Sequence, residues 1–245
     1  MPYESVIGID CATLAERVGL ARARRGADAW VVDDVALGSS SRPPAATLAA
    51  WLRDEPRALI ALDAPLGWPT ALGPALAGHR AGDAIEVDAA ALFTRATDHA
   101  VRARHGKRPL DVGADRIART ARSALDLLAV ARRATGYTIA LAWHPAESGE
   151  PRTIEVYPAA TLAAHGLPSR QYKEPGSAAR GPIAAAVQER LVLPAGFDPV
   201  AAAGDALDAL LCLWAGLDFV EGAAVGPAPD ERAVAEREGW IWVRG

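Results

Sequence analysis

Cysteine is scarce in this sequence of 245 residues. Only Cys11 and Cys212 are present, so the chain carries no disulfide framework and suits a reducing compartment. No apolar run approaches the roughly 18 residues that a membrane span requires. Residues Met1 to Asp10 also lack the basic start and long apolar stretch of a secretory signal. We therefore expect a cytoplasmic protein with no membrane partner.

Several nucleotide-binding and hydrolase signatures are missing as well. The sequence contains no Gly-x-Gly-x-x-Gly or Walker motif and no Gly-x-Ser-x-Gly elbow. Its five histidines show no paired metal-ligand spacing. These absences disfavour dinucleotide binding, P-loop NTPase activity, serine hydrolysis and a zinc site. The formal net charge of −4 gives no global indication of a nucleic-acid partner.

What is present begins with a pattern of short apolar strands. Ser5–Asp10, Arg17–Arg22 and Trp30–Leu37 follow one another after short breaks, which predicts an antiparallel meander. A helix predicted over Ala45–Arg53 then leads to Ala58–Asp63, a continuous apolar run typical of a strand buried on both faces. A strand reached through a helix joins its sheet in parallel.

The remaining elements are mostly helical, and we expect one domain over residues 1–245 with a helical insertion at about 66–150. The further predicted elements are a helix over Asp115–Arg133, strands over Tyr137–Trp143 and Arg152–Tyr157, helices over Ala159–His165, Ala178–Leu191 and Val200–Val220, and a short strand over Gly239–Arg244. The order of strands and helices is the skeleton of the ribonuclease H fold. We therefore predict an α/β fold of this type, with a mixed five-stranded sheet flanked by helices.

Asp10 and Asp63 end the two apolar strands that this fold makes parallel neighbours. Such neighbours bring their carboxyl ends to the same edge of the sheet, about 5 Å apart. Two carboxylates this close repel each other unless a cation lies between them, and Mg²⁺ or Mn²⁺ prefers such oxygen ligands. The alternative is that each aspartate only forms a turn or caps a helix.

A third acidic group comes from the predicted last long helix. Asp205 and Asp208 share one face of this helix, opposite a buried stripe that includes Leu207 and Leu210. On their own, two aspartates near a helix start could simply stabilise its first turn. Together with the sheet edge, they would complete a two-metal cage. Glu155, between Ile154 and Val156, is either solvent-facing or a further ligand or base.

Basic residues concentrate between Arg95 and Arg133. Arg116, Arg119 and Arg122 lie on the side of their predicted helix opposite its apolar stripe. This arginine stripe could follow a phosphate backbone, or it could be an ordinary solvated helix face.

Several segments, in the right order, resemble family 429 of the domains of unknown function, whose members are predicted to be ribonuclease-H-like nucleases. The matching segments are VIGID (6–10), LIALDAPLG (59–67), RATD (95–98), IEVYP (154–158), YK (172–173) and DALDA (205–209). The resemblance implies that Asp10, Asp63, Glu155, Asp205 and Asp208 occupy the family's acidic motif positions. It also implies pocket roles for Arg95, Thr97, Asp98 and Lys173. In better-studied nucleases of this fold, the first strand, the fourth strand and the last helix supply the metal ligands.

The leading hypothesis is a metal-dependent nuclease or phosphodiesterase, a hydrolase acting on nucleic acid or a nucleotide. Asp10 would bridge two ions, with Asp63 and either Asp205 or Asp208 as outer ligands. Arg95 and Lys173 would contact phosphate oxygens. One alternative is a non-catalytic metal- or nucleotide-binding module on the same fold. Another is phosphoryl chemistry on a small molecule.

Overall fold

The computed structural model describes residues 2–113, 115–147 and 149–245. Within these residues the main sheet has seven strands, in the order β5-β6-β4-β1-β2-β3-β7. They are β1 (Ser5–Asp10), β2 (Gly19–Arg25), β3 (Trp30–Leu37), β4 (Ala58–Asp63), β5 (Ala140–Leu141), β6 (Arg152–Glu155) and β7 (Leu191–Val192). Strands β1, β2 and β3 form the antiparallel meander, while β4 joins β1 and β6 joins β4 in parallel. The fold is therefore the ribonuclease-H-like α/β fold that the sequence predicts.

The differences from the predicted sheet lie at its edges and in its second strand. The sheet has seven strands instead of the predicted five. Strand β5 is a two-residue part of the strand predicted over Tyr137–Trp143, whereas the two-residue strand β7 is not predicted. Strand β2 begins at Gly19 instead of Arg17, because Ala15–Arg17 forms a turn of 3-10 helix. Two further strands, β8 (Ala224–Val225) and β9 (Val243–Arg244), form a separate small sheet near the C-terminus.

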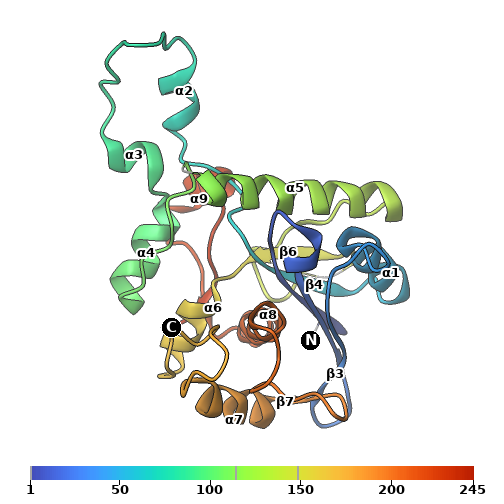
Figure 1. Cartoon of the computed structure of the whole chain (residues 1–245). Helices are drawn as coiled ribbons and strands as arrows, with labels where there is room; N and C mark the ends of the chain where they lie inside the picture. Colours follow the sequence, from blue (N-terminus) through green and yellow to red (C-terminus); the bar gives the residue numbers. More distant parts are fainter. Residues whose placement is uncertain (1, 114, 148) are drawn as a thin grey trace.

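Helices cover both faces of the main sheet. They are α1 (Pro44–Asp54), α2 (Leu72–Leu76), α3 (Ala89–Phe93), α4 (Ala96–His105), α5 (Asp115–Thr135), α6 (Pro158–Ala164), α7 (Arg180–Arg190), α8 (Gly204–Val220) and α9 (Arg232–Glu238). In Figure 1, α5 crosses above the sheet and α8 lies below it. The core divides accordingly, since Ile7 and Ile60 pack with α1 and α5, whereas Val6 and Leu59 pack with α8.

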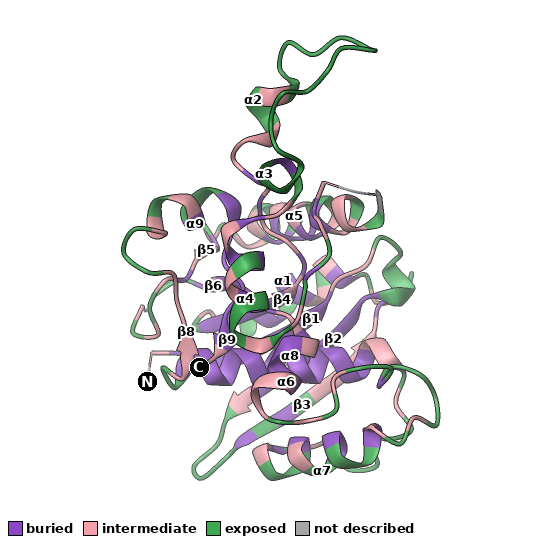
Figure 2. Ribbon diagram, turned by 90° about the vertical axis from the view of Figure 1, so that its left-hand side faces the viewer, coloured by how far each residue is buried: buried purple, intermediate pink, exposed green. Residues whose placement is uncertain are grey.

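Helix α8 is the best buried helix of the molecule and lies unusually close to the sheet. All its residues from Ala206 to Val220 are buried, as Figure 2 shows in purple. A Cβ atom added at Gly8 would lie 2.1 Å from the Ala209 carbonyl oxygen, and one at Gly19 would lie 1.9 Å from that of Asp205. The two glycines therefore let the helix approach the backbone of β1 and β2, and this approach carries the acidic face of α8 to the sheet edge.

The segment between β4 and β5 contains α2, α3, α4 and α5. Its first part, with α2 and α3, extends away from the body of the molecule (Figure 1), and Figure 2 shows that most of it is exposed. None of the helices that the structure describes combines the length and apolar character needed to cross a membrane.

Candidate functional site

Two carboxylates lie side by side at one edge of the main sheet. Asp10 ends β1, Asp63 ends β4, and the two residues are direct partners in the parallel register. Because side chains alternate along a strand, Asp10 is on the same face as Val6 and Gly8, which contact α8. Asp63 has the matching position on β4, so both carboxylates belong to the face covered by α8.

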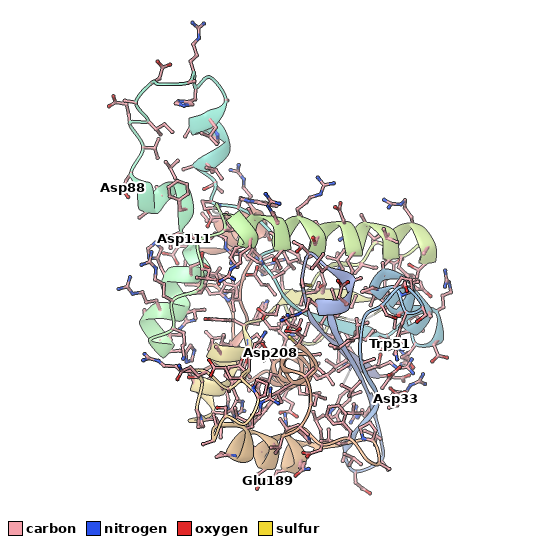
Figure 3. All side chains as sticks on the ribbon, in the orientation of Figure 1. Asp33, Trp51, Asp88, Asp111, Glu189 and Asp208 are labelled. Carbon is pink, nitrogen blue, oxygen red and sulfur yellow. The ribbon has the colours of Figure 1, made fainter. Side chains whose placement is uncertain are left out.

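Helix α8 brings a third carboxylate to this edge. One carboxylate oxygen from each of Asp10, Asp63 and Asp208 lies within 4.8 Å of the other two, and we call these residues the carboxylate trio. Asp208 is 1% exposed, and its Oδ1 atom has no hydrogen-bond partner among the described residues. Figure 3 shows its place in the interior of the molecule. A buried oxygen without a donor is energetically costly, which fits a cation ligand.

An ammonium group lies next to the trio. The Nζ atom of Lys173 is 3.0 Å from Asp10 Oδ2 and 2.5 Å from Asp208 Oδ2. Asp63, in contrast, has no side-chain hydrogen bond or ion pair within the part of the chain that the structure describes. Lys173 therefore neutralises the cluster only in part.

Arg180 holds the loop that carries Lys173, and sequence reasoning did not single it out. Its buried guanidinium donates to the carbonyl oxygens of Tyr172 and Lys173, at 3.0 and 2.7 Å, and also to Val200 and Ala202. A sequence signal was available. Arg180 precedes Ile183 and Val187 by three and seven positions, so it falls on the buried stripe of α7.

Burial raises the pKa of every carboxyl group in the trio. The pKa of Asp10 rises from its ordinary value of 3.8 to about 7, because the group is buried and because Asp208 adds a like charge. Burial also raises the pKa of Asp63, with contributions from Asp10 and Asp208, and it raises that of Asp208 against the effect of Lys173. Burial lowers the pKa of Lys173, but the charges of Asp208 and Asp10 outweigh it and raise that pKa. The clustered carboxyl groups therefore favour the binding of a cation at this site.

Asp205 lies outside the trio. Its Oδ2 atom accepts a hydrogen bond of 2.7 Å from the Arg17 Nε atom, and its Oδ1 atom is 3.9 Å from Lys173 Nζ. Of the two aspartates that the sequence proposes as ligands on this helix, only Asp208 has an oxygen within reach of both Asp10 and Asp63.

Glu155 and Arg95 form a buried ion pair beside the trio. The Arg95 guanidinium donates to both carboxylate oxygens of Glu155, at 2.8 and 2.7 Å, and to Asp98 Oδ1 at 3.0 Å. The backbone N–H of Leu66 also donates to Glu155 Oε2. Glu155 is therefore buried and fully bonded instead of solvent-facing, and its pKa is raised by burial although Arg95 opposes the shift.

Thr97 and Asp98 hold α4 in place. Thr97 Oγ1 accepts a hydrogen bond of 2.7 Å from the backbone N–H of Ile241, and Asp98 Oδ2 accepts one from the backbone N–H of Arg95. Neither residue lines the cleft beside the trio. Their predicted contact with a substrate stays a prediction, while these bonds give both residues a structural role.

A cleft of about 380 Å³ opens beside the trio, and two of its members, Asp10 and Asp63, belong to the lining. It is lined by Asp10, Cys11, Asp63, Ala64, Pro65, Arg95, Pro109, Leu110, Arg116, Ile117, Thr120, Glu155, Val156, Tyr157, Lys173 and Ile241. Arg116, at the start of the arginine stripe, belongs to the cleft wall. Arg119 and Arg122 continue the stripe along α5 as exposed residues, and Arg122 pairs with Asp126 at 2.9 Å. The stripe thus leads from the cleft onto an exposed helix face.

Comparison with known proteins gives a family and one structural likeness. A family model described as "Protein of unknown function (DUF429)" matches residues 8–232, and the chain belongs to this family. No curated protein matches the sequence. The chain is similar to a solved structure described as "T. thermophilus RuvC in complex with Holliday junction substrate", at 14% sequence identity and a TM-score of 0.40, over 90% of this chain and 97% of that chain. The family match confirms the resemblance found in the sequence.

Proposed function

We propose that this member of the DUF429 family is a divalent-metal-dependent phosphodiesterase that cleaves nucleic acid. The observation that carries the proposal is the carboxylate trio, which joins β1, β4 and α8 in one cluster. Its donors are all carboxylate oxygens, the ligands that Mg²⁺ and Mn²⁺ prefer. The unpartnered Oδ1 atom of Asp208 gives the cluster a buried acceptor that a cation would satisfy.

Asp10, Asp63 and Asp208 would hold the ion at the point where Asp10 and Asp63 line the cleft. A bound divalent ion supplies charge neutralisation at a phosphate group and acidifies water. Lys173 places a positive charge beside the same point, where it would contact a phosphate oxygen. Tyr157 and Ile117 contribute apolar surface to the walls, which limits the access of bulk water.

A polyanionic substrate is supported by the basic surface next to the cleft. Exposed arginines on α4, on α5 and in the segment between them are Arg102, Arg104, Arg108, Arg116, Arg119, Arg122 and Arg133. Arg116 connects this surface to the cleft itself. Exposed arginines outside the cleft would not contact a small phosphate ester bound in it, whereas they could contact further phosphates of a nucleic acid.

Arg95 and Glu155 serve the proposed activity as positioning residues. The guanidinium of Arg95 is 1% exposed and is bonded to Glu155 and Asp98. It therefore has little capacity left for a phosphate. The ion pair ties β6 to the start of α4, at the edge of the cleft, and so keeps the wall beside Asp63 in place.

The test is a cleavage assay with Mg²⁺ and with Mn²⁺ on single-stranded, duplex, hybrid and branched nucleic acids. We expect turnover that EDTA abolishes, and a loss of about 100-fold or more in Asp10→Asn, Asp63→Asn and Asp208→Asn, because each removes an ion ligand. Asp28→Asn is the matched control, since Asp28 is exposed and lies in the turn between β2 and β3. Its activity should equal that of the parent protein.

Two results would contradict the proposal. Activity that survives Asp10→Asn would remove the trio from the mechanism. Tight binding of divalent ions and nucleic acid without turnover on any of the four substrates would identify a non-catalytic binding module on the same fold.

A further inference from the structure

We infer that the carboxylate trio holds a single divalent ion and that the ammonium group of Lys173 takes the place of a second one. The inference deepens the proposed function and rests on it. The sequence predicts two ions and assigns Lys173 only to phosphate oxygens of the substrate. The contacts of Lys173 change that expectation.

Charge balance is the first reason. The trio contributes three carboxylates, and Lys173 Nζ is within 3.0 Å of two of them. With the ammonium in place, two negative charges are left uncompensated, and one divalent ion neutralises both. A second divalent ion would give this buried cluster a net positive charge next to Lys173, which is costly in a desolvated site.

The division of oxygen atoms is the second reason. Lys173 bonds to the Oδ2 atoms of Asp10 and Asp208. Within the described residues, the Oδ1 atom of Asp208 accepts no hydrogen bond of good geometry, although the Tyr172 hydroxyl lies near enough to lower the pKa of the Asp208 carboxyl. The carboxylate of Asp63 has neither a side-chain hydrogen bond nor an ion pair there. The ammonium group therefore binds the two Oδ2 atoms, and the carboxylate oxygens that it does not bind are left for one ion.

The neighbouring carboxylates are already engaged, which is the third reason. Asp205 is bonded to Arg17, and both oxygens of Glu155 accept hydrogen bonds from Arg95. Within the described residues, the three members of the trio are the only cluster whose carboxylate, histidine or cysteine atoms meet closely enough to hold an ion. A second ion would have to break one of these ion pairs to complete its ligands.

The choice of lysine at position 173 supports the same conclusion. The sequence has 26 basic residues, and only Lys107 and Lys173 among them are lysines. An ammonium is a compact point charge of the kind that can replace a metal ion among carboxylates, whereas a guanidinium is a planar fork. Arg180 fixes the backbone of Lys173 through two carbonyl oxygens, so the charge is held in position by the loop.

The experiment is calorimetric titration of the full chain with Mn²⁺, without substrate. We expect one ion per chain in the parent protein. Lys173→Met removes the charge and should open the second position, giving two ions per chain and about tenfold or more tighter binding of the first. Lys173→Arg keeps the charge and should retain one ion. Lys107→Met, which removes the other lysine, is the matched control and should behave as the parent.

Each outcome decides. Two ions in the parent protein, or only one ion in Lys173→Met whatever its affinity, overturn the inference while leaving the proposed function standing. The absence of any Mn²⁺ binding by the parent protein overturns the proposed function itself. Circular dichroism of each variant checks that it is folded. If Lys173→Met is unfolded, the number of ions bound by the parent and by Lys173→Arg decides alone.

Discussion

Asp205 and Asp208 are one helical turn apart on α8, yet they have different partners. Asp205 faces Arg17, whereas Asp208 meets Asp10 and Asp63. Spacing alone predicts that both share a face, and it cannot tell which one reaches the sheet edge. The answer depends on the position at which α8 packs along β1, and the sequence does not specify this position.

The difference gives a prediction at the scale of single residues. Asp208→Asn should lose the stabilisation by Mg²⁺, while Asp205→Asn should keep most of it, since Asp205 lies outside the trio. An ion present at 100 times its Kd adds about 2.7 kcal/mol, which raises Tm by about 5–10 °C in a chain of this size. Thermal melts of each variant with and without Mg²⁺ measure this rise in Tm. Equal losses in the two variants would contradict the assignment of Asp208 as the ligand.

Lys173 and Arg180 mark the limit of sequence reasoning at this scale. The family resemblance identifies Lys173 as a pocket residue, but its position among the carboxylates depends on four backbone carbonyls that Arg180 gathers from two loops. The contact of Lys173 with Asp10 joins residues 163 positions apart, and a contact between segments so far apart in the chain has no local signature in the sequence.

Among the elements, β1 and β4 are the ones that the sequence predicts best. Both are continuous apolar runs bounded by polar residues, so hydrophobic burial determines where each begins and ends, and both end at the predicted aspartates. Strand β7 depends on pairing at the sheet edge, and the polar helix α9 has little periodicity of its own. These two elements form through tertiary contacts and escape prediction, whereas β5 lies within the strand predicted over Tyr137–Trp143 and is only shorter.

The close approach of α8 to β1 gives a prediction at the scale of elements. In Gly8→Ala, the added Cβ atom would lie 2.1 Å from the Ala209 carbonyl oxygen and 2.6 Å from the Leu213 nitrogen, so α8 must move. We expect a loss of about 1–3 kcal/mol or more in the free energy of unfolding, together with weaker Mn²⁺ binding, because Asp208 moves with the helix. Chemical denaturation and calorimetric titration measure the two effects.

Gly181→Ala is the control for this substitution. Gly181 lies in α7, and a Cβ atom there would meet nothing within 4 Å. Alanine should stabilise the helix by about 0.5–1 kcal/mol and leave ion binding unchanged. If Gly8→Ala behaved like Gly181→Ala, the tight packing of α8 would not be what positions Asp208.

For the whole molecule, the trio is a source of instability without a metal ion. The pKa of Asp10 is raised to about 7 in the folded state, mainly by burial, from an ordinary value of 3.8. A raised carboxyl pKa favours folding below the ordinary value, and this contribution is lost as the pH rises through the folded value. Between pH 4 and 7, by this linkage, the metal-free protein loses the part of its stability that depends on Asp10.

The prediction compares the parent protein with Asp10→Asn in EDTA. From about pH 5 to about pH 8, the free energy of unfolding of the parent should fall relative to that of Asp10→Asn, which cannot ionise at this position. Denaturant titrations at the two pH values measure the difference, and Asp28→Asn should follow the parent. A parent protein that gains stability relative to Asp10→Asn over this range would show that the pKa of Asp10 is not raised in the folded state.

The most direct measurement of the central claim is a crystal structure of the protein soaked in Mn²⁺, with anomalous data collected for the metal. We predict one anomalous peak, at about 2.1 Å from an oxygen of Asp10, Asp63 and Asp208 each, with Lys173 still beside Asp10 and Asp208. A fully soaked crystal with no peak between these three carboxylates would contradict the assignment of this sheet edge as a metal centre.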